Sequence, residues 1–259
     1  MKSWTVRGLG GAFWMAGLLL SLLTTGAAAQ TSGAHETWNL ASMEDFVPFN
    51  YARDESYVGI DVEILEEMAR RLDVRLRHHP LPWRRAILEF EAGRFDALFQ
   101  LAMTQERERD YVMVGPLRQT RTVWMVRKDD PVHDIPDYAS LRDRVIGLVS
   151  GFMYSPAFNS ETSLRKEYSS DDAANIRKLL MGRTDVIVGG SETLVFVAKA
   201  LGVSDQLRIL PTPLTVQNRY IAFHRTPEGL ERAARCQAVL DQMSASGRTI
   251  QIVHAFLNR

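Results

Sequence analysis

A short polar stretch around Arg107 holds the residues with the clearest potential for ligand chemistry. Thr104, Glu106 and Arg107 closely follow the apolar run 97–99, which we interpret as a buried strand. In open α/β sheets, ligands bind in the crevice beyond the carboxyl ends of the strands. An arginine at that place can hold a carboxylate through two parallel hydrogen bonds. The alternative is a solvated charge run, because the charges from Glu106 to Asp110 alternate in sign.

The elements that would position Arg107 are a helix and the strand that follows it. Trp83, Ala86 and Phe90 recur at helical spacing, so one face of a short helix is apolar. Gly93 is suited to end this helix, because glycine adopts the left-handed conformation at little cost. The pattern predicts a helix packed on one side of a sheet, with the polar turn at the strand end.

Three segments together resemble the bacterial extracellular solute-binding proteins of family 3, the periplasmic receptors of polar-amino-acid ABC transporters. They read PFNY…VGIDVEILEEMARRL, PLPWRRAILEFEAGRFDALF and MTQERERDYVMVGPL. The similarity extends from about Trp38 to the C-terminus. It implies an α/β fold of the type II periplasmic-binding-protein class, a two-lobed clamshell. Each lobe would be a mostly parallel sheet flanked by helices, and two crossovers would form the hinge. The resemblance also implies that Arg107 holds a ligand carboxylate.

The resemblance places further residues at the cleft between the lobes. Phe46 and Phe49 follow the first expected strand, 38–43, where they either floor the crevice or pack beneath a proline turn. The loop 151–154 would present the second lobe to the ligand. The candidate ligand-binding residues are Arg107, Phe46, Phe49, Trp83, Gln100, Ala102, Phe152, Tyr154, Gly190 and Glu192.

This chain departs from the family pattern at three of these positions. Ala102 stands where the family often has a serine hydroxyl, and the second-lobe loop lacks the usual threonines. The family's acid for a ligand ammonium falls near Gly190, which has no side chain. Glu192 either turns inward to replace that acid or lies in the first turn of a helix capped by Ser191. The missing acid favours an organic acid or a modified amino acid as ligand.

Composition excludes several other classes. The chain has 31 basic and 31 acidic residues, so no electrostatic argument supports a nucleic acid or an anionic membrane as partner. The single cysteine, Cys236, lies on an apolar helical stripe and reads as a buried thiol. The adjacent pair His78 and His79 is a poor metal site. We expect no metal, no cofactor and no catalytic residue.

The first 29 residues have the organisation of a cleaved signal peptide. Lys2 and Arg7 form a basic segment, 12–23 is apolar, and three alanines precede Gln30. We therefore expect a periplasmic protein that starts near Gln30. The polar stretch 128–131 suggests a boundary. The expected lobes are residues 30–125 plus 221–259, and residues 126–220.

Several local expectations concern charged residues and strands. Asp61 reads as the N-cap of the helix that follows Gly59 rather than as a catalytic acid. Either Asp171 or Asp172 caps a later helix. Residues 111–114 and 122–126 read as two separate strands that flank the first crossover.

These observations favour a monomeric periplasmic solute-binding protein rather than an enzyme. It would deliver a carboxylate-bearing solute, an amino acid or a related organic acid, to an ABC permease. The alternatives are a ligand-sensing or orphan binding protein, and a periplasmic enzyme on the same fold, such as a cyclohexadienyl dehydratase.

Overall fold

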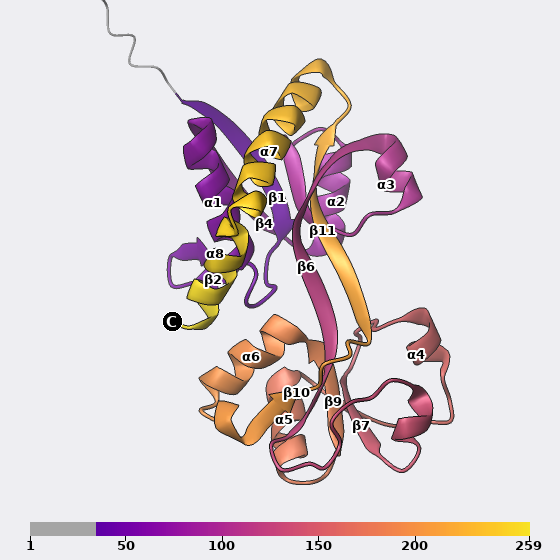
Figure 1. Ribbon diagram of the computed structural model, residues 1–259. Helices are drawn as coiled ribbons and strands as arrows, with labels where there is room; N and C mark the ends of the chain where they lie inside the picture. Colours follow the sequence, from indigo (N-terminus) through magenta and orange to yellow (C-terminus); the bar gives the residue numbers. More distant parts are fainter. Residues whose placement is uncertain (1–34) are drawn as a thin grey trace, which may run out of the picture. The chain divides into compact units, whose positions relative to one another are not determined.

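The computed structural model describes residues 35–259, in which strands and helices alternate along most of the chain (Figure 1). The expected signal peptide lies outside the described residues. The strands are β1 (Glu36–Met43), β2 (Tyr51–Arg53), β3 (Ser56–Val58), β4 (Val74–Leu81), β5 (Ala97–Leu101), β6 (Tyr111–Arg127), β7 (Val145–Val149), β8 (Arg165–Ser169), β9 (Val186–Gly190), β10 (Leu207–Ile209) and β11 (Thr215–His224). The α-helices are α1 (Ile60–Leu72), α2 (Trp83–Glu91), α3 (Gln105–Asp110), α4 (Pro156–Ser160), α5 (Asp172–Leu180), α6 (Ser191–Ala200), α7 (Pro227–Ala245) and α8 (Arg248–Leu257).

A curled mixed sheet connects two lobes, as the fold-class prediction required. The strand order is β4-β1-β5-β11-β6-β9-β7-β8, and β10 also pairs with β6. Pairing is parallel between β1 and both β4 and β5, and between β7 and both β8 and β9, whereas β11 pairs antiparallel with β5 and β6 pairs antiparallel with β9. The two crossover strands, β6 and β11, pair antiparallel and run from one lobe into the other (Figure 1).

The first crossover is one strand of 17 residues, so the prediction of two separate strands was wrong. Pro116 lies inside this strand and offers no N–H to the ladder. The strand continues because its partner adapts, with a register shift between Arg219 and Ile221 of β11. The ladder therefore bends at this point without ending.

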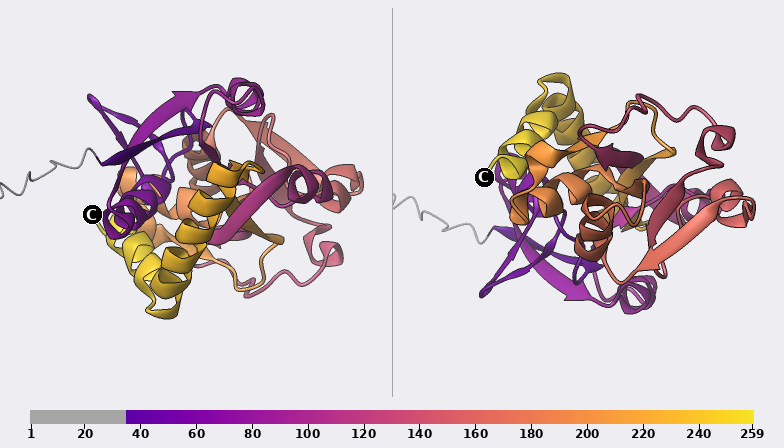
Figure 2. Two further views of the ribbon diagram at one scale, coloured as in Figure 1. Left: turned by 90° about the horizontal axis from the view of Figure 1, so that it is seen from above. Right: turned by 90° about the horizontal axis from the view of Figure 1, so that it is seen from below.

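The apolar residues sort into clusters that follow the lobes. In the first lobe, α1, α7 and α8 pack together over one side of the strands, and α2 covers the other (Figure 2). Leu40 packs with residues of α1, α7 and α8, whereas its neighbour Ala41 packs with residues of α2. Strands buried on both faces are mostly apolar, and β5 is buried at every position, with Gln100 as its one polar residue. In β6, Val123, Trp124 and Met125 pack with second-lobe residues.

The start of α1 differs from the prediction and explains a buried charge. Gly59, at a φ of 141°, is the N-cap, and a Cβ there would stand 2.2 Å from the carbonyl oxygen of Phe49. The backbone N–H groups of Ile60 and Asp61 donate to the carbonyls of Pro48 and Phe49. The Asp61 side chain is therefore not a cap, as had been predicted, and is free for another partner.

That partner is Arg118 of β6. Its Nε donates to one oxygen of Asp61 at 2.5 Å, and its Nη2 donates to the other at 3.0 Å. The side chains are 5% and 0% exposed, respectively. Arg118 also donates to Thr120 Oγ1 at 2.7 Å. This bidentate pair ties the first crossover strand to the start of α1.

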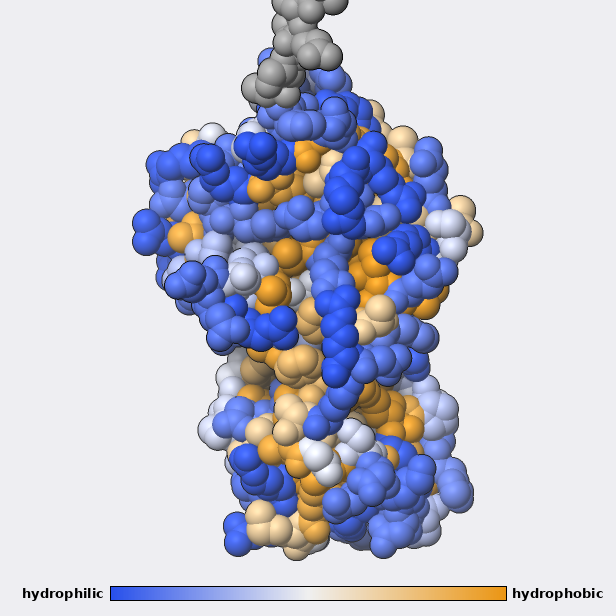
Figure 3. Space-filling model, turned by 90° about the vertical axis from the view of Figure 1, so that its left-hand side faces the viewer, coloured by the Kyte–Doolittle hydropathy of each residue, from blue (hydrophilic) through white to orange (hydrophobic). Residues whose placement is uncertain are grey.

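The lobes also touch beside the crossover strands, through helix α6. Phe196 of α6 stacks on Phe256 of α8 with ring centroids 6.4 Å apart, and it meets the edge of Tyr51. Lys199 Nζ donates to the carbonyl of Leu257 at 3.1 Å. The surface of the described residues narrows between the lobes (Figure 3). Among residues 35–259, no helix combines the length and the hydropathy that a membrane span requires.

We predict that the buried pair is a main determinant of stability. Arg118→Met would leave Asp61 as an unpaired charge in the interior, a change that costs about 3–5 kcal/mol. Urea denaturation should show this loss. The control is Arg121→Met, in the same strand at an exposed position, which should change stability by less than about 0.5 kcal/mol. Equal effects of the two substitutions would contradict this role.

Candidate functional site

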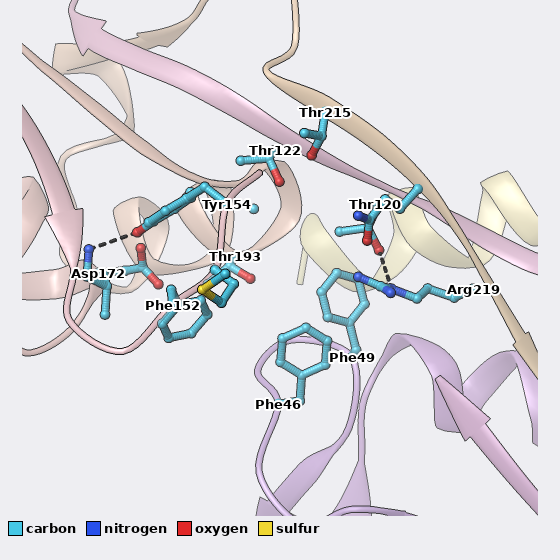
Figure 4. A pocket seen from close by; sticks show the side chains of 15 residues that line it. Phe46, Phe49, Thr120, Thr122, Phe152, Tyr154, Asp172, Thr193, Thr215 and Arg219 are labelled. Carbon is cyan, nitrogen blue, oxygen red and sulfur yellow. Dashed lines mark hydrogen bonds between the residues drawn. The ribbon is translucent and has the colours of Figure 1, made fainter. Parts of the chain in front are cut away.

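A cavity of about 710 Å³, partly open to solvent, lies between the lobes (Figure 4). Residues of the first lobe, the crossover strands and the second lobe all contribute to its wall. They are Phe46, Phe49, Thr120, Thr122, Val149, Phe152, Met153, Tyr154, Asp172, Gly189, Gly190, Thr193, Thr215, Gln217 and Arg219. Apolar rings, four threonine hydroxyls and two charged groups therefore surround one space.

Aromatic rings line the cavity from both lobes. Phe46 and Phe49 pack with ring centroids 5.0 Å apart, and the Arg118 guanidinium lies 3.4 Å from the centre of the Phe49 ring. On the second lobe, Phe152 is 58% exposed at the rim. Tyr154 is buried, and its hydroxyl accepts a hydrogen bond from the Val149 N–H at 2.8 Å. Burial raises the pKa of Tyr154 to about 12, so the phenol stays neutral.

Arg219 gives one end of the cavity a positive charge (Figure 4). Its Nε donates to Thr120 Oγ1 at 3.2 Å, and no carboxylate of the described residues lies within 4.0 Å of its guanidinium. Burial lowers the pKa of Arg219, and the charges of Arg118 and Arg107 lower it further. Asp61 is the nearest counter-charge, but Arg118 already occupies both of its oxygens. An anion at this end would relieve the repulsion among the arginines.

Asp172 gives the opposite end a carboxyl group (Figure 4). Its neighbour Asp171 caps α5 by accepting a hydrogen bond from the Ala174 N–H at 2.7 Å. The Asp172 side chain makes no hydrogen bond or ion pair with any described residue. Burial raises the pKa of Asp172 to about 6, and the charge of Asp171 adds to this effect. An acid held this way is a group that a cation can bind.

The glycine pair at the end of β9 makes room for this acid. A Cβ on Gly189 would stand 3.1 Å from Asp172 Oδ1 and 3.0 Å from Leu194 Cγ. A side chain at Gly189 would therefore press on both neighbours. Gly190 forms the wall beside it and is the N-cap of α6 without any side-chain hydrogen bond.

Five of the ten residues proposed from the sequence line this cavity: Phe46, Phe49, Phe152, Tyr154 and Gly190. The other five lie outside its wall: Arg107, Trp83, Gln100, Ala102 and Glu192. Trp83, the first residue of α2, packs against the apolar cluster on that side of the sheet.

Gln100 lies near the end of β5, Ala102 directly follows the strand, and Arg107 lies in α3. Thr104 caps α3 by accepting from the Arg107 N–H, and Arg107 Nη1 donates to the Ala102 carbonyl at 2.9 Å. Arg107 is half-buried and close enough for its charge to act on Arg219. Gln100 has a φ of 76° and accepts from the Met43 N–H at 3.3 Å, while its amide donates to Asn50. Its side chain thus braces the loop that carries Phe46 and Phe49.

Glu192 lies in the first turn of α6, after the N-cap Gly190 rather than after a Ser191 cap as had been predicted. One of its carboxylate oxygens is buried without a hydrogen-bond partner among the described residues. Burial raises the pKa of Glu192, against the opposing influence of Arg118 and Arg121. Thr193, the next residue, donates to the Val47 carbonyl at 3.1 Å, so this turn lies where the lobes meet.

Sequence reasoning missed the two charged ends of the cavity. Asp172 was considered only as a helix cap, although one of two adjacent acids suffices for that role. Arg219 was assigned only to a strand, although an arginine in a strand between lobes needs a partner. Within residues 35–259, no group of three or more His, Cys, Asp or Glu residues could hold a metal ion.

Comparison with known proteins places the chain in one family of binding proteins. Residues 39–259 match the model of the bacterial extracellular solute-binding proteins, family 3. A probable amino-acid-binding protein of Bacillus subtilis is 22% identical over 264 residues, which cover 100% of this chain and 96% of that protein. The second substrate-binding domain of GlnP from Lactococcus lactis, solved in an open conformation, superposes with a TM-score of 0.73 at 16% identity, covering 87% of this chain and 97% of that domain. This likeness concerns the fold.

One enzyme also matches, over a short region. A cyclohexadienyl dehydratase of Pseudomonas aeruginosa is 31% identical over 86 residues, which are 32% of each chain. The binding-protein relative is matched over 96% of its length, whereas the enzyme is matched over 32% of its length.

We predict that Asp172 makes the ligand-free protein less stable at neutral pH than at acidic pH. Its carboxyl has a pKa of about 6 in the folded protein, against an ordinary pKa of 3.8. Its contribution to stability is therefore fully present below about pH 3.8 and is lost as the pH rises through about 6. Asp172→Asn should be more stable than the wild type at pH 7.5 by about 1 kcal/mol. This value allows for partial exposure and for a lost charge at a helix start.

Urea denaturation at several pH values, from about 4.5 to about 8, measures this difference in the free energy of unfolding. The control is Asp171→Asn, because hydrogen bonding to the Ala174 N–H lowers the pKa of Asp171, so its pH dependence should have the opposite sign. A stability gain for Asp172→Asn that does not grow with pH would contradict the assignment.

Proposed function

The chain belongs to the bacterial extracellular solute-binding proteins of family 3, and from this premise we propose that it is a receptor for transport. It captures a small carboxylate-bearing solute, an amino acid or a related organic acid, in the cleft between its lobes. It then delivers the solute to an ABC transporter in the inner membrane. The matched relative, named as a probable amino-acid-binding protein, supports this proposal.

The observation that carries the proposal is the uncompensated positive end of the cavity. Arg219 lines it and Arg107 acts on it electrostatically. The ion pairs among the described residues engage neither arginine with a carboxylate. A solute carboxylate at this end would accept hydrogen bonds from a fork of N–H donors. We propose that Arg107 is the principal clamp, as the family resemblance implies, and that Arg219 is the second.

We propose lobes of residues 30–125 plus 221–259, and residues 126–220, with the hinge in the ladder between β6 and β11. The register shift between Arg219 and Ile221 supports this location. Residues 123–125 pack with second-lobe residues, so we propose that the bend falls on the ladder just before them, slightly ahead of the boundary at residue 125 that the sequence suggests. The protein is proposed to act as a monomer.

A second candidate is an enzyme of the cyclohexadienyl dehydratase type, which the 86-residue similarity favours. Such a reaction needs a general acid beside a leaving hydroxyl, and Asp172 is an acid in the cavity with a raised pKa. We propose binding without catalysis, because the match over the full chain is to a binding protein. Formation of an aromatic product from a cyclohexadienyl acid, followed by absorbance, would decide for the enzyme.

We predict that carboxylate-bearing solutes stabilise the mature protein. A thermal-shift screen should cover amino acids, dicarboxylates, aromatic acids and polyamines. A ligand that binds only the folded state stabilises it by about 2.7 kcal/mol at a hundredfold excess over Kd. At least one carboxylate should raise the melting temperature, and polyamines should not. Failure of every carboxylate would argue against the proposed function.

The best solute of the screen then tests the clamp. Arg107→Ala should weaken its binding by about 2–5 kcal/mol, because the substitution removes one partner of a charged pair that becomes buried when the lobes close. Calorimetry measures the affinity. The matched control is Arg109→Ala in the same helix, because Arg109 is exposed and pairs with Asp110. Wild-type affinity in a folded Arg107→Ala protein would exclude Arg107 as the clamp.

We also propose export to the periplasm with cleavage after Ala29, on the basis of the N-terminal sequence. Mass spectrometry of protein released from the periplasm should find an N-terminus at or near Gln30. A full-length chain confined to membranes would contradict cleavage.

A further inference from the structure

Gln100 occupies an irregular position near the end of β5. On either side of it, Leu101 pairs with Tyr220 of β11 and Phe99 pairs with the next residue of that strand. Gln100 is therefore the extra residue of a β-bulge, a feature that often re-aims a side chain next to a functional site. Its φ of 76° lies in the left-handed region, which glycine adopts freely and other residues adopt only when their surroundings hold them there. A glutamine at this position therefore needs a role for its side chain.

That side chain connects the end of β5 to the loop of residues 44–50, which follows β1. The Gln100 amide donates to Asn50 Oδ1, and Gln100 Oε1 accepts from the Met43 N–H at 3.3 Å. Asn50 Nδ2 in turn donates to the Met43 carbonyl at 2.5 Å and to the Tyr57 hydroxyl at 2.6 Å. Tyr57 donates to that same carbonyl at 2.7 Å. Because Gln100 and Asn50 are only 6% and 0% exposed, losing one partner would leave a buried polar group unpaired.

Both sides of this network carry parts of the proposed site. The loop 44–50 carries the two phenylalanine rings of the first-lobe cavity wall (Figure 4). Two residues beyond Gln100, the Ala102 carbonyl accepts a hydrogen bond from Arg107 Nη1 at 2.9 Å. The bulge and its hydrogen bonds thus connect the segment that carries the aromatic rings to the segment that orients the proposed clamp.

We propose that Gln100 is a positioning residue of the receptor, which acts through Asn50 to hold the aromatic rings and Arg107 in one fixed arrangement. This inference rests on the proposed function, since the arrangement matters for affinity only if a solute binds between these groups. A solute that contacts the rings and the arginine together loses affinity when either is mobile, because binding must then first order the site. Gln100 lies outside the cavity wall, so it acts without touching the solute.

The alternative is that the network only stabilises the fold, as other buried hydrogen bonds do. Gln100→Gly separates the two roles. The substitution removes both hydrogen bonds of the side chain, but glycine also relieves the left-handed backbone and so offsets part of the loss in stability. The affinity for a solute has no such compensation. Gln100→Asn is a second variant, because asparagine tolerates this backbone but is one methylene too short to reach both partners.

The first measurement needs no solute. Hydrogen–deuterium exchange, followed by mass spectrometry, reports on the loop 44–50, in which the N–H groups of Phe46, Phe49 and Asn50 are hydrogen-bonded. We expect both Gln100 variants to exchange in this loop at least about tenfold faster than the wild type, because a less restrained segment opens more readily.

Calorimetry then measures affinity. The probe is the amino acid, dicarboxylate or aromatic acid that gives the largest shift in the thermal screen. Both Gln100 variants should bind it about tenfold more weakly. Phe46→Ala should weaken the probe by about fivefold in the wild type, but by less than about twofold in the Gln100→Gly background, because the ring is then already displaced.

The matched control is Ser42→Ala. Ser42 is buried and its hydroxyl is hydrogen-bonded to the Tyr57 hydroxyl at 2.7 Å, but it makes none of the hydrogen bonds of Gln100. The substitution should lower stability in urea denaturation, and it should leave both the exchange of the loop and the affinity for the probe unchanged.

The outcomes separate this inference from the proposed function. Wild-type affinity in the folded Gln100 variants, or effects of Phe46→Ala and Gln100→Gly that simply add, would overturn the inference and leave the receptor function standing. Weaker binding without faster exchange of the loop would overturn it in favour of direct contact between Gln100 and the solute. Absence of binding by every carboxylate-bearing probe to the wild type would overturn both.

Discussion

The buried pair between Asp61 and Arg118 is the interaction on which the binding cleft depends. Each charge would be costly alone in the interior, and the two are joined by a bidentate ion pair. The pair fixes the start of α1 against β6. It also holds the guanidinium under the Phe49 ring at 3.4 Å, so the aromatic floor of the cavity is set by the same contact.

The pair also explains why Arg219 is left for a solute. Asp61 is the acid whose charge acts on Arg219, but both of its oxygens are used by Arg118. Thr120 connects the two arginines, since it accepts hydrogen bonds from both side chains. The crossover strands therefore present a positive end, whereas Asp172 lies on the second-lobe wall. Closure of the lobes on a solute carboxylate would neutralise the positive end, and this gives ligand binding a physical reason to favour closure.

Individual helices and strands could be predicted from the sequence, because each depends on the spacing of residues that are close together in the chain. The helix from Trp83 and the strand after Gly93 follow from spacing and from glycine, and they occur as α2 and β5. Long-range partners could not be predicted in this way. Asp61 was expected to cap a helix because acids before apolar stripes often do, yet it pairs with a residue 57 positions away. The single strand β6 was missed because the compensating register shift lies in β11.

The charged ends of the cavity illustrate the same limit. Asp171 and Asp172 are indistinguishable as helix caps in the sequence, and only the fold decides that Asp171 caps while Asp172 faces the cavity. Arg219 becomes a candidate only when the crossover strand is seen to pass between the lobes. The aromatic residues Phe46, Phe49 and Tyr154 were easier to place, because the family resemblance located their loops.

Calorimetry on an Arg219→Gln protein tests the central claim, that the positive end of the cavity receives the solute carboxylate. The substitution should weaken binding of a carboxylate-bearing solute by about 2–5 kcal/mol, because it removes a charge from the partly buried end of the cavity. The control is Arg121→Gln, at an exposed position of β6, which should leave the affinity unchanged. Equal affinities of the wild type and a folded Arg219→Gln protein would contradict the account.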